Sequence, residues 1–425
     1  MSEFTEAMSR TADAATARFE RSQQSPPRDF HRELGRRRRA RFAVAGVASI
    51  VGVVLATTAV AFGLRWFSDE VQPAVPGELR WSLDVGSELW STPLVVGDRA
   101  YLGAADGSLY AVDLEDGSIA WSFATSDAVR STPVDVDGMI VFSSDDNVVY
   151  AVRDDGDDAA LEWSTEISAV REIRGRYDTT SSSPVVVDGL IVVGSTRGVV
   201  ALDVVTGEIA WSLESRSPVR STPACTQTTC VVGGNDGYLR AIDVATGVVA
   251  WEVPFGGAIV SSPAIVDGLV LSGSRNTQIR ALDLDSGEEV WAIDIAPSWA
   301  ESSVVIDGDT AYFGSSNAGT VFAVDAASGE VRWEALVRGM PWPRPTVDHG
   351  TVYVNTAIVD GDPSWPHTVY ALRASDGVPL WRAGVGAALT WNPGEGARGA
   401  LTSPVVFDTG VLVAGLDGIL YAFAR

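Results

Sequence analysis

Eight tryptophans recur at a nearly constant spacing along this chain of 425 residues. Consecutive members lie 40 to 48 residues apart, and the series is Trp81, Trp121, Trp163, Trp211, Trp251, Trp291, Trp333 and Trp381. A fixed period in this range is typical of an architecture in which each repeat is one supersecondary unit. The chain is therefore expected to fold as a series of similar units, and its chemistry is expected where the series is interrupted.

Most of these tryptophans end a similar phrase, as in LYAVDLEDGSIAW at 109–121 and LRAIDVATGVVAW at 239–251. Apolar residues alternate with other residues on both sides of Asp-Gly or Thr-Gly, which predicts two strands joined by a tight turn. A second hairpin lies upstream, as in SPVVVDGLIVV at 183–193, and a turn such as Asp236-Gly237 joins the two hairpins. Each unit is thus predicted to be four antiparallel strands, A to D, with the tryptophan in strand D.

Four-stranded units that repeat about every 40 residues are typical of β-propeller blades. Residues 401–425 supply strands A, B and C of a last unit, whereas ELRWSL around Trp81 is a D strand without the other three. Pairing of these two pieces would close the ring and remove the exposed sheet edges. We therefore predict an all-β, eight-bladed propeller over residues 79–425, in which the repeated tryptophans are structural and pack between neighbouring blades.

The phrase AxDxxTGxxxW, with Ser-Pro opening strand A, resembles the PQQ-like repeat of the quinoprotein propellers, and the resemblance covers residues 79–425. That family includes pyrroloquinoline quinone (PQQ) dehydrogenases. It also includes non-enzymatic propellers, such as the lipoprotein of the outer-membrane β-barrel assembly machinery and extracellular sensor domains. The dehydrogenases carry long insertions that build a cofactor chamber, whereas most units here are minimal, so the chain resembles the non-enzymatic members more.

The N-terminal region contains a candidate membrane span. Residues 42–64 are 23 apolar or small residues without a charge, which is long enough to cross a bilayer. Six arginines between 32 and 41 precede the span, so the N-terminus is expected in the cytoplasm. The predicted organisation is a disordered basic cytoplasmic tail at 1–41, a single transmembrane helix at 42–64, a linker at 65–78 and an extracytoplasmic propeller at the cell membrane.

A cleaved signal peptide is the alternative for this region, with Ala59-Val60-Ala61 as the cleavage motif. The 41 residues that precede the apolar segment are long for such a leader, which favours the retained anchor. No cysteine lies near the end of the segment, so a lipid anchor is not expected.

The charge distribution excludes some classes of partner. The first 41 residues contain ten Arg against six Asp or Glu, and the whole chain carries −24, so the remainder carries about −28. A propeller this acidic is not expected to bind nucleic acid or anionic lipid through its bulk surface. We expect a monomeric propeller whose contact with the membrane is the one helix.

The chain has only two cysteines, Cys225 and Cys230, which flank a four-residue loop in ACTQTTC. They should face each other across a hairpin, at a separation that permits a disulfide. A disulfide fits an oxidising compartment. A metal site is not expected, because there is no other Cys and only three His. The acidic turn at 154–158 is interpreted as solvated rather than as a calcium site.

Three interruptions of the repeat are expected on one face of the propeller. Residues 164–181 and 382–401 form long D–A connections, and residues 355–367 enlarge a B–C connection. Loop variation on a rigid scaffold is where binding usually resides. The candidate binding residues within these loops are Arg174, Tyr177, Trp365 and Trp391.

The residue before each strand-A motif should ring the central channel at this face. The ring is Trp90, Arg130, Ser181, Arg220, Val260, Glu301, Trp342 and Leu401, and Arg344 lies in PRPTV, which replaces one Ser-Thr-Pro start. Arginines beside aromatic rings suit an anionic or planar ligand, or a peptide. The alternative is that these side chains fill the channel and pair with one another, Glu301 with an arginine.

The expected function is that of a non-enzymatic binding or scaffold module for a protein, peptide or small ligand, without a cofactor and with no catalytic residues. The resemblance implies one alternative, a PQQ-dependent oxidoreductase of alcohols or sugars with Ca²⁺, in which Glu301 would be the base and Trp90 or Trp342 would stack on the quinone. A further alternative is an assembly factor that pairs with an extended peptide through a strand edge.

Overall fold

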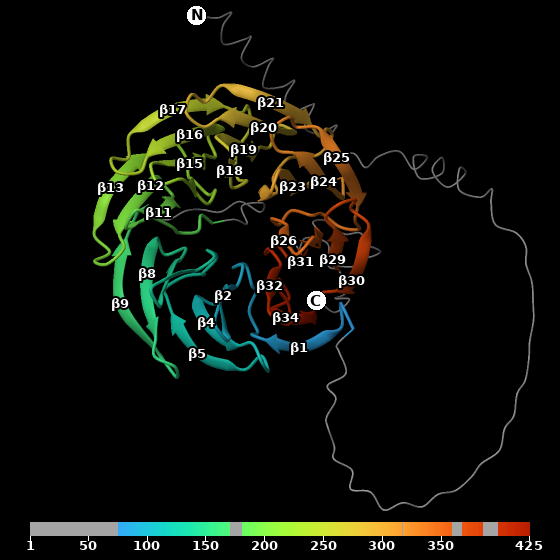
Figure 1. Ribbon diagram of the computed structural model, residues 1–425. Helices are drawn as coiled ribbons and strands as arrows, with labels where there is room; N and C mark the ends of the chain where they lie inside the picture. Colours follow the sequence, from blue (N-terminus) through green and yellow to red (C-terminus); the bar gives the residue numbers. More distant parts are fainter. Residues whose placement is uncertain (1–74, 171–180, 317, 359–367, 386–397) are drawn as a thin grey trace, which may run out of the picture. The chain divides into compact units, whose positions relative to one another are not determined.

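The computed structural model describes residues 75–170, 181–316, 318–358, 368–385 and 398–425, and its regular elements are all β-strands. Eight four-stranded antiparallel sheets are arranged in a ring (Figure 1). Residues Pro73–Arg425 form one compact unit. The prediction of an eight-bladed propeller with four-stranded blades is confirmed.

Blades 1 to 4 each consist of four consecutive strands, which are hydrogen-bonded in chain order from strand A to strand D. They are β2 (Leu94–Val96), β3 (Arg99–Gly103), β4 (Ser108–Asp113) and β5 (Ile119–Ala124); β6 (Val134–Val136), β7 (Met139–Ser143), β8 (Val148–Asp154) and β9 (Ala159–Glu166); β10 (Val185–Val187), β11 (Leu190–Ser195), β12 (Gly198–Asp203) and β13 (Ile209–Glu214); and β14 (Ala224–Cys225), β15 (Thr229–Gly233), β16 (Tyr238–Asp243) and β17 (Val249–Pro254).

Blades 5 to 8 follow the same plan, except that blade 8 combines the two ends of the described chain. They are β18 (Ala264–Val266), β19 (Leu269–Gly273), β20 (Gln278–Asp283) and β21 (Glu289–Asp294); β22 (Val305–Asp307), β23 (Thr310–Gly314), β24 (Thr320–Asp325) and β25 (Val331–Leu336); β26 (Thr346–Asp348), β27 (Thr351–Asn355), β29 (Thr368–Arg373) and β30 (Pro379–Gly384); and β32 (Val405–Phe407), β33 (Gly410–Ala414), β34 (Ile419–Ala424) and β1 (Leu79–Asp84).

The ring closes as the sequence predicts. Strand β1 pairs antiparallel with β34, with Trp81 opposite Ala422, and the two lie side by side in Figure 1. Strand A of each blade contacts strand A of the next blade. The contact between β2 of blade 1 and β32 of blade 8 completes the circle. Gly77, with φ of +82°, precedes β1 and donates its N–H to Ala424 O at 2.8 Å. It thereby takes the place of the turn glycine that the other blades have between strands C and D.

The repeated tryptophans lie between blades. Trp211 in blade 3 donates its Nε1–H to Val244 O of blade 4 at 2.8 Å, and its ring covers Gly247 in the C–D turn of that blade. Gly247 has φ of +73°, and a Cβ there would lie 2.7 Å from the ring. The same ring-on-glycine contact recurs at six further interfaces, between Trp81 and Gly117, Trp163 and Gly207, Trp251 and Gly287, Trp291 and Gly329, Trp333 and Gly377, and Trp381 and Gly77. The tryptophan of one repeat thus packs on the turn glycine of the next repeat.

At the interface between blades 1 and 2, the tryptophan Nε1–H donates to a side-chain carboxylate instead of to a backbone carbonyl. Asp154 accepts hydrogen bonds from Trp121 Nε1 at 3.0 Å, Tyr101 Oη at 2.5 Å and Arg99 at 2.6 Å. Burial raises the pKa of Asp154, but these bonds and one from the Gly156 N–H outweigh it and lower the pKa to about 2. The acidic turn is therefore not purely solvated, because its first carboxylate holds two blades together.

The predicted disulfide is present. Cys225 in β14 lies opposite Cys230 in β15, with the two Cα atoms 4.1 Å apart, and the two sulfurs are bonded. It crosslinks the A–B hairpin of blade 4, and the protein has no other cysteine.

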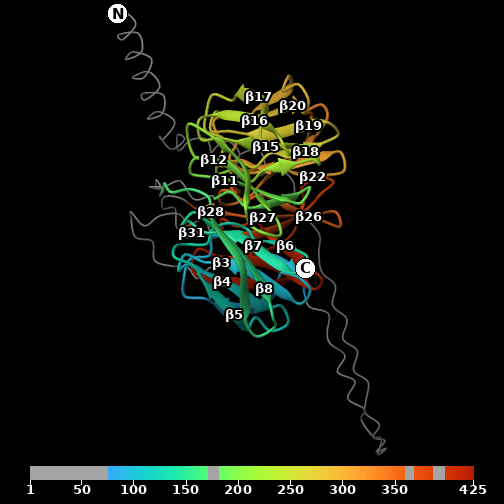
Figure 2. The ribbon, with the colours of Figure 1, turned by 90° about the vertical axis from the view of Figure 1, so that its left-hand side faces the viewer.

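The two long D–A connections each begin three residues later than expected, because strand D extends beyond its tryptophan: they run over 167–184, from β9 to β10, and over 385–404, from β30 to β32. Strand β9 continues to Glu166 and β30 to Gly384, so residues 164–166 and 382–384 belong to strands. Between the B–C connection of blade 7 and the D–A connection that follows this blade, β28 (Ala357–Ile358) pairs with β31 (Arg398–Gly399) (Figure 2). No helix in the described part of the chain is long and apolar enough to cross a membrane, and the predicted span at 42–64 lies outside it.

Candidate functional site

Two consecutive hydroxyl residues, as in Ser-Thr-Pro, open every blade except blade 7, and the two hydroxyls perform different structural tasks. In blade 4 the buried Ser221 Oγ accepts the Gly233 N–H at 2.7 Å and donates to Gly233 O at 3.0 Å. This latch fastens the start of strand A to the end of strand B within one blade. Equivalent bonds are made by Ser131, Ser182, Ser261 and Thr402.

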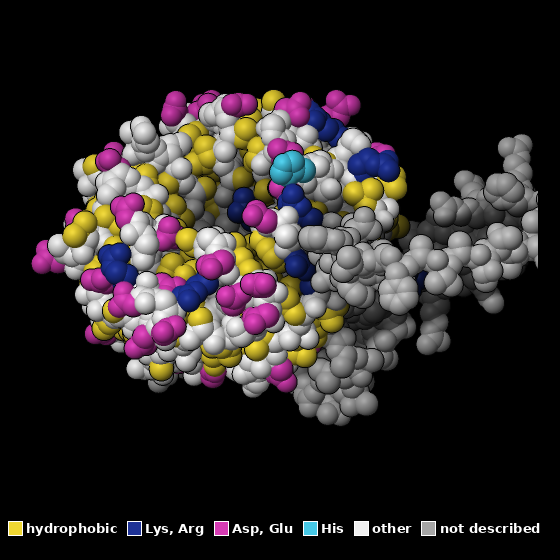
Figure 3. Space-filling view, turned by 60° about the horizontal axis from the view of Figure 1, so that its bottom comes forward, with side chains coloured by type: hydrophobic (Ala, Val, Ile, Leu, Met, Phe, Trp, Pro, Cys, Tyr) yellow, Lys and Arg dark blue, Asp and Glu magenta, His cyan; other side chains and the backbone are white. Residues whose placement is uncertain are grey.

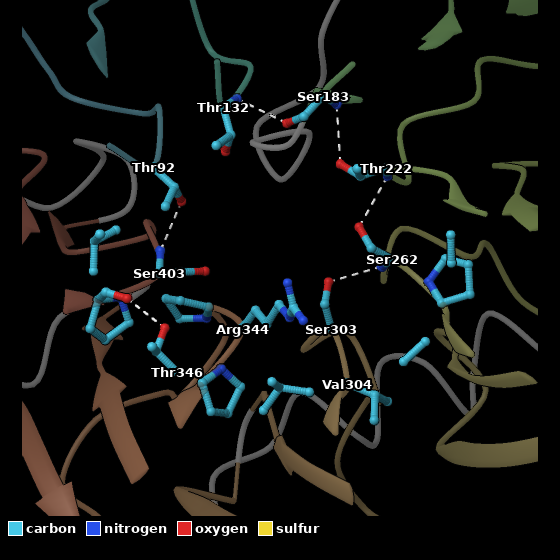
Figure 4. A pocket seen from close by; sticks show the side chains of 18 of the residues that line it. Thr92, Thr132, Ser183, Thr222, Ser262, Ser303, Val304, Arg344, Thr346 and Ser403 are labelled. Atoms are coloured by element: carbon cyan, nitrogen blue, oxygen red, sulfur yellow. Dashed lines mark hydrogen bonds between the residues drawn. The ribbon is translucent and has the colours of Figure 1, made fainter. Parts of the chain in front are cut away.

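The next hydroxyl joins neighbouring blades around the channel, as Figure 4 shows. The backbone N–H of one blade donates to the hydroxyl of the following blade: Thr132 to Ser183 at 2.9 Å, Ser183 to Thr222 at 3.1 Å, Thr222 to Ser262 at 3.0 Å, Ser262 to Ser303 at 2.9 Å and Ser403 to Thr92 at 3.0 Å. We call these seven residues, Thr92, Thr132, Ser183, Thr222, Ser262, Ser303 and Ser403, the hydroxyl ring. Sequence reasoning missed it, although the recurring Ser-Thr-Pro motif was the signal.

Blade 7 breaks both patterns. Pro343 stands where the other blades have the latch hydroxyl, and Arg344 stands where they have the ring hydroxyl. The hydroxyl that would accept the Ser303 N–H is therefore missing. Two bonds from neighbouring blades hold this segment in place: Ser302 donates to Pro343 O at 3.1 Å, and Thr346 donates to Pro404 O at 2.5 Å.

Arg344 extends from blade 7 into the channel, where its guanidinium end lies beside Ser303 (Figure 4). Its side chain keeps contact with the open lumen, yet protein surrounds it closely enough that burial lowers its pKa. No carboxylate among the described residues forms a salt bridge with it, and none raises its pKa.

The channel is a cavity of about 1010 Å³, and all eight residues predicted to ring it line it, together with Arg344. At its mouth, the guanidinium of Arg130 lies 4.5 Å from the centroid of the Trp90 ring and its Nε is 2.7 Å from Asp145 Oδ2. The Trp90 Nε1–H donates to Glu88 at 2.9 Å. These contacts fix one aromatic ring and one cation at the rim.

Glu301 is paired with an arginine, but not with a member of the predicted ring. Its Oε1 lies 2.5 Å from Nε of Arg275, which comes from the B–C connection of blade 5 and lies 5.8 Å from the Trp299 ring centroid. The alternative is therefore right that Glu301 pairs with an arginine, and the arginine found, Arg275, comes from outside the ring. The described side chains leave a cavity here, and Arg130 and Glu301 each turn to a charge from a B–C connection.

The four candidate residues in the loops, Arg174, Tyr177, Trp365 and Trp391, lie outside the described residues. The six candidates from the inner ends of the blades, Trp90, Arg130, Arg220, Glu301, Trp342 and Arg344, are brought together around one cavity. Trp342 keeps its buried Nε1–H without an acceptor in the described structure.

The described cavity residues do not fit a calcium-bound quinone. Calcium takes six to eight oxygen ligands, among which carboxylates are usual. No group of three Asp, Glu, His or Cys within the described ranges is arranged to hold a metal ion, and the carboxylate of the predicted ring, Glu301, is already paired with Arg275. We therefore derive no chemistry through such a group.

The fold and its cavity define a class, a closed eight-bladed propeller whose architecture supports a binding or scaffold module. The sequence matches the PQQ_2 family model, described as outer membrane protein assembly factor BamB, over residues 71–200, 159–277, 196–354 and 275–425. Together these segments cover the whole propeller, so the chain belongs to this family. The predicted PQQ-like repeat is confirmed. No curated protein matches the chain.

Solved structures show the same fold. BamB from Moraxella catarrhalis is 20% identical with a TM-score of 0.62, over 83% of this chain and 100% of that one. Sqt1 from Saccharomyces cerevisiae is 15% identical with a TM-score of 0.65, over 83% and 100%. The quinohemoprotein alcohol dehydrogenase from Comamonas testosteroni is 14% identical with a TM-score of 0.62, over 81% and 76%. At these identities the likeness concerns the fold alone.

Proposed function

We propose that this protein is a membrane-anchored, extracytoplasmic propeller that acts as a non-enzymatic binding or scaffold module. It takes a protein, peptide or small ligand on the face where the D–A and B–C connections emerge. The observation that carries the proposal is the convergence of Trp90, Arg130, Arg220 and Trp342 on the mouth of one open cavity. Aromatic residues and arginine are the side chains most enriched where proteins bind partners.

The charge on the opposite face is compatible with this choice of site. Figure 3 shows that face, on which the A–B and C–D turns lie: Asp and Glu side chains are spread widely over it, and fewer basic side chains are visible. A negatively charged partner is therefore disfavoured there. Membership of the BamB-described family supports a protein partner.

A photo-activatable amino acid at position 90, in the full-length chain in its native cells, tests the proposal. We expect a discrete cross-linked species that is lost when Arg130 is also replaced by Ala. The matched control places the same group at Val205, which is 74% exposed in the C–D turn of blade 3, on the opposite face. The same species from both positions, or none from position 90, would contradict the proposal.

Sequencing the N-terminus of the protein purified from these cells tests the anchor. A chain that retains residues 42–64 and remains in the membrane fraction supports it. A chain that begins after Ala61 supports the signal-peptide alternative instead.

A further inference from the structure

In the part of the chain that the structure describes, the hydroxyl ring has no bond between Thr92 and Thr132, and it is interrupted again at blade 7, where an arginine takes the place of the hydroxyl and hydrogen-bond donors are left beside it. Each of Ser183, Thr222, Ser262, Ser303 and Thr92 accepts a backbone N–H through its hydroxyl oxygen. None of these five hydroxyls donates to an acceptor in the described residues. A hydroxyl whose oxygen is occupied in this way still has its own proton to give, so the lumen at this level is lined by donors.

Three different donors meet where blade 7 interrupts the ring. Ser303 has a hydroxyl proton, and its backbone N–H has no ring acceptor because position 344 is arginine. The guanidinium of Arg344, which carries five N–H groups and can never accept, lies beside it (Figure 4). Donors without an acceptor around a fixed positive charge form a site for an anion.

Three of the other charged side chains that line the channel are paired. Arg130 lies against Asp145, and Glu301 lies against Arg275. Near the other end of the lumen, Asp348 accepts from Arg425 at 2.9 Å and from His349 at 2.8 Å. Arg344 is the cation that none of these pairs compensates, in a domain whose overall charge is strongly negative.

We propose that Arg344, together with the hydroxyl and backbone N–H of Ser303, binds the oxyanion group of a small ligand, a carboxylate or a phosphate, inside the channel. The inference rests on the proposed function, because it assigns a ligand class to part of the same cavity. It explains why one blade departs from the Ser-Thr-Pro motif at the position where the others join the ring. A bidentate arginine is suited to both groups.

Titration calorimetry of the full-length protein in chloride buffer, with inorganic phosphate and separately with citrate, tests the site. We expect one saturable site for at least one anion, and a loss of at least tenfold in affinity in Arg344→Ser. Tighter binding of citrate would identify a carboxylate ligand, and tighter binding of phosphate a phosphate ligand. Arg344→Lys should bind more weakly than the native protein and more tightly than Arg344→Ser, because lysine keeps the charge but loses the planar fork.

Two controls keep the result interpretable. Arg344→Ser restores the residue type found at this position in the other blades, so its unfolding midpoint should not fall. Arg373→Ser removes an exposed arginine of the same blade that pairs with Asp376 at 2.8 Å, and it should leave anion binding unchanged. Equal binding by Arg344→Ser and the native chain, or no binding of either anion, would overturn the proposal. The titration needs no partner. Failure of the cross-link at position 90 would therefore contradict the proposed function without contradicting the anion site.

Discussion

Blades 4 and 7 share one four-stranded frame and differ at their inner ends. In blade 4, Ser221 fastens strand A to strand B and Thr222 joins the hydroxyl ring on both sides. In blade 7, Pro343 and Arg344 make neither contact, and the segment is held from outside. Asn355 at the end of β27 donates to Thr402 O of blade 8 at 2.8 Å, and β28 pairs with β31.

The difference shows where this fold tolerates change. Both blades receive the tryptophan of the preceding blade in the same way, since Trp211 donates to Val244 O and Trp333 to Ala374 O, each at 2.8 Å. The tryptophan contact between blades is therefore kept in blade 7. At the channel, in contrast, Pro343 and Arg344 do not make the hydrogen bonds that the hydroxyl residues make in blade 4. A residue released in this way is available for binding.

Removal of these tryptophans should have the largest effect. Trp211→Ala and Trp333→Ala should each lower the free energy of unfolding by about 3 kcal/mol, because each empties a packed site over a turn glycine and removes a hydrogen bond. Urea denaturation of the two variants measures this. Equal losses would show that blade 7 is regular at its outer strands, whereas a much smaller loss for Trp333→Ala would break the comparison.

The interface between blades 1 and 2 should lose stability in acid, unlike the interfaces of Trp211 and Trp333. The pKa of Asp154 is about 2 in the folded protein, below its ordinary value of 3.8. Its ionised form therefore contributes stability that is fully present above about pH 4 and is lost as the pH falls toward 2. At pH 7, Asp154→Asn should cost about 2 kcal/mol, and the difference from the native protein should shrink over that window.

Urea denaturation at pH 7, 4 and 2.5 measures this dependence. Trp211→Ala serves as the control, because its partner is a carbonyl that does not titrate. A constant difference between Asp154→Asn and the native protein at all three pH values would contradict the assignment.

The smallest effect is expected at the latch. Ser221→Ala should cost about 1.5 kcal/mol, because the buried Gly233 N–H loses its acceptor. Pro343→Ala, at the matched position of blade 7, removes no hydroxyl and should cost clearly less. Thermal unfolding of both variants measures the contrast. Equal losses would mean that the latch hydroxyl contributes nothing to blade 4.

Sequence reasoning located the channel-lining positions but not their bonding. The alignment of the Ser-Pro starts placed Trp90, Glu301 and Arg344 at the cavity, because the repeat carries one register around the ring. It missed the hydroxyl ring, since each bond joins residues about 40 apart in different blades. It also interpreted the acidic turn as solvated, because nothing local shows that Asp154 meets Trp121 from the blade before it.

The sequence by itself determined the number of blades, the four-stranded plan, the closure by β1 and the disulfide. All of these follow from local alternation and turns repeated at one period, or from two cysteines only five positions apart. Only the tertiary structure decided the charge partners: Arg275 for Glu301, Asp145 for Arg130 and, among the described residues, none for Arg344. These partners lie on connections whose directions are set by blade twist and by contacts between blades, and no local pattern encodes those directions.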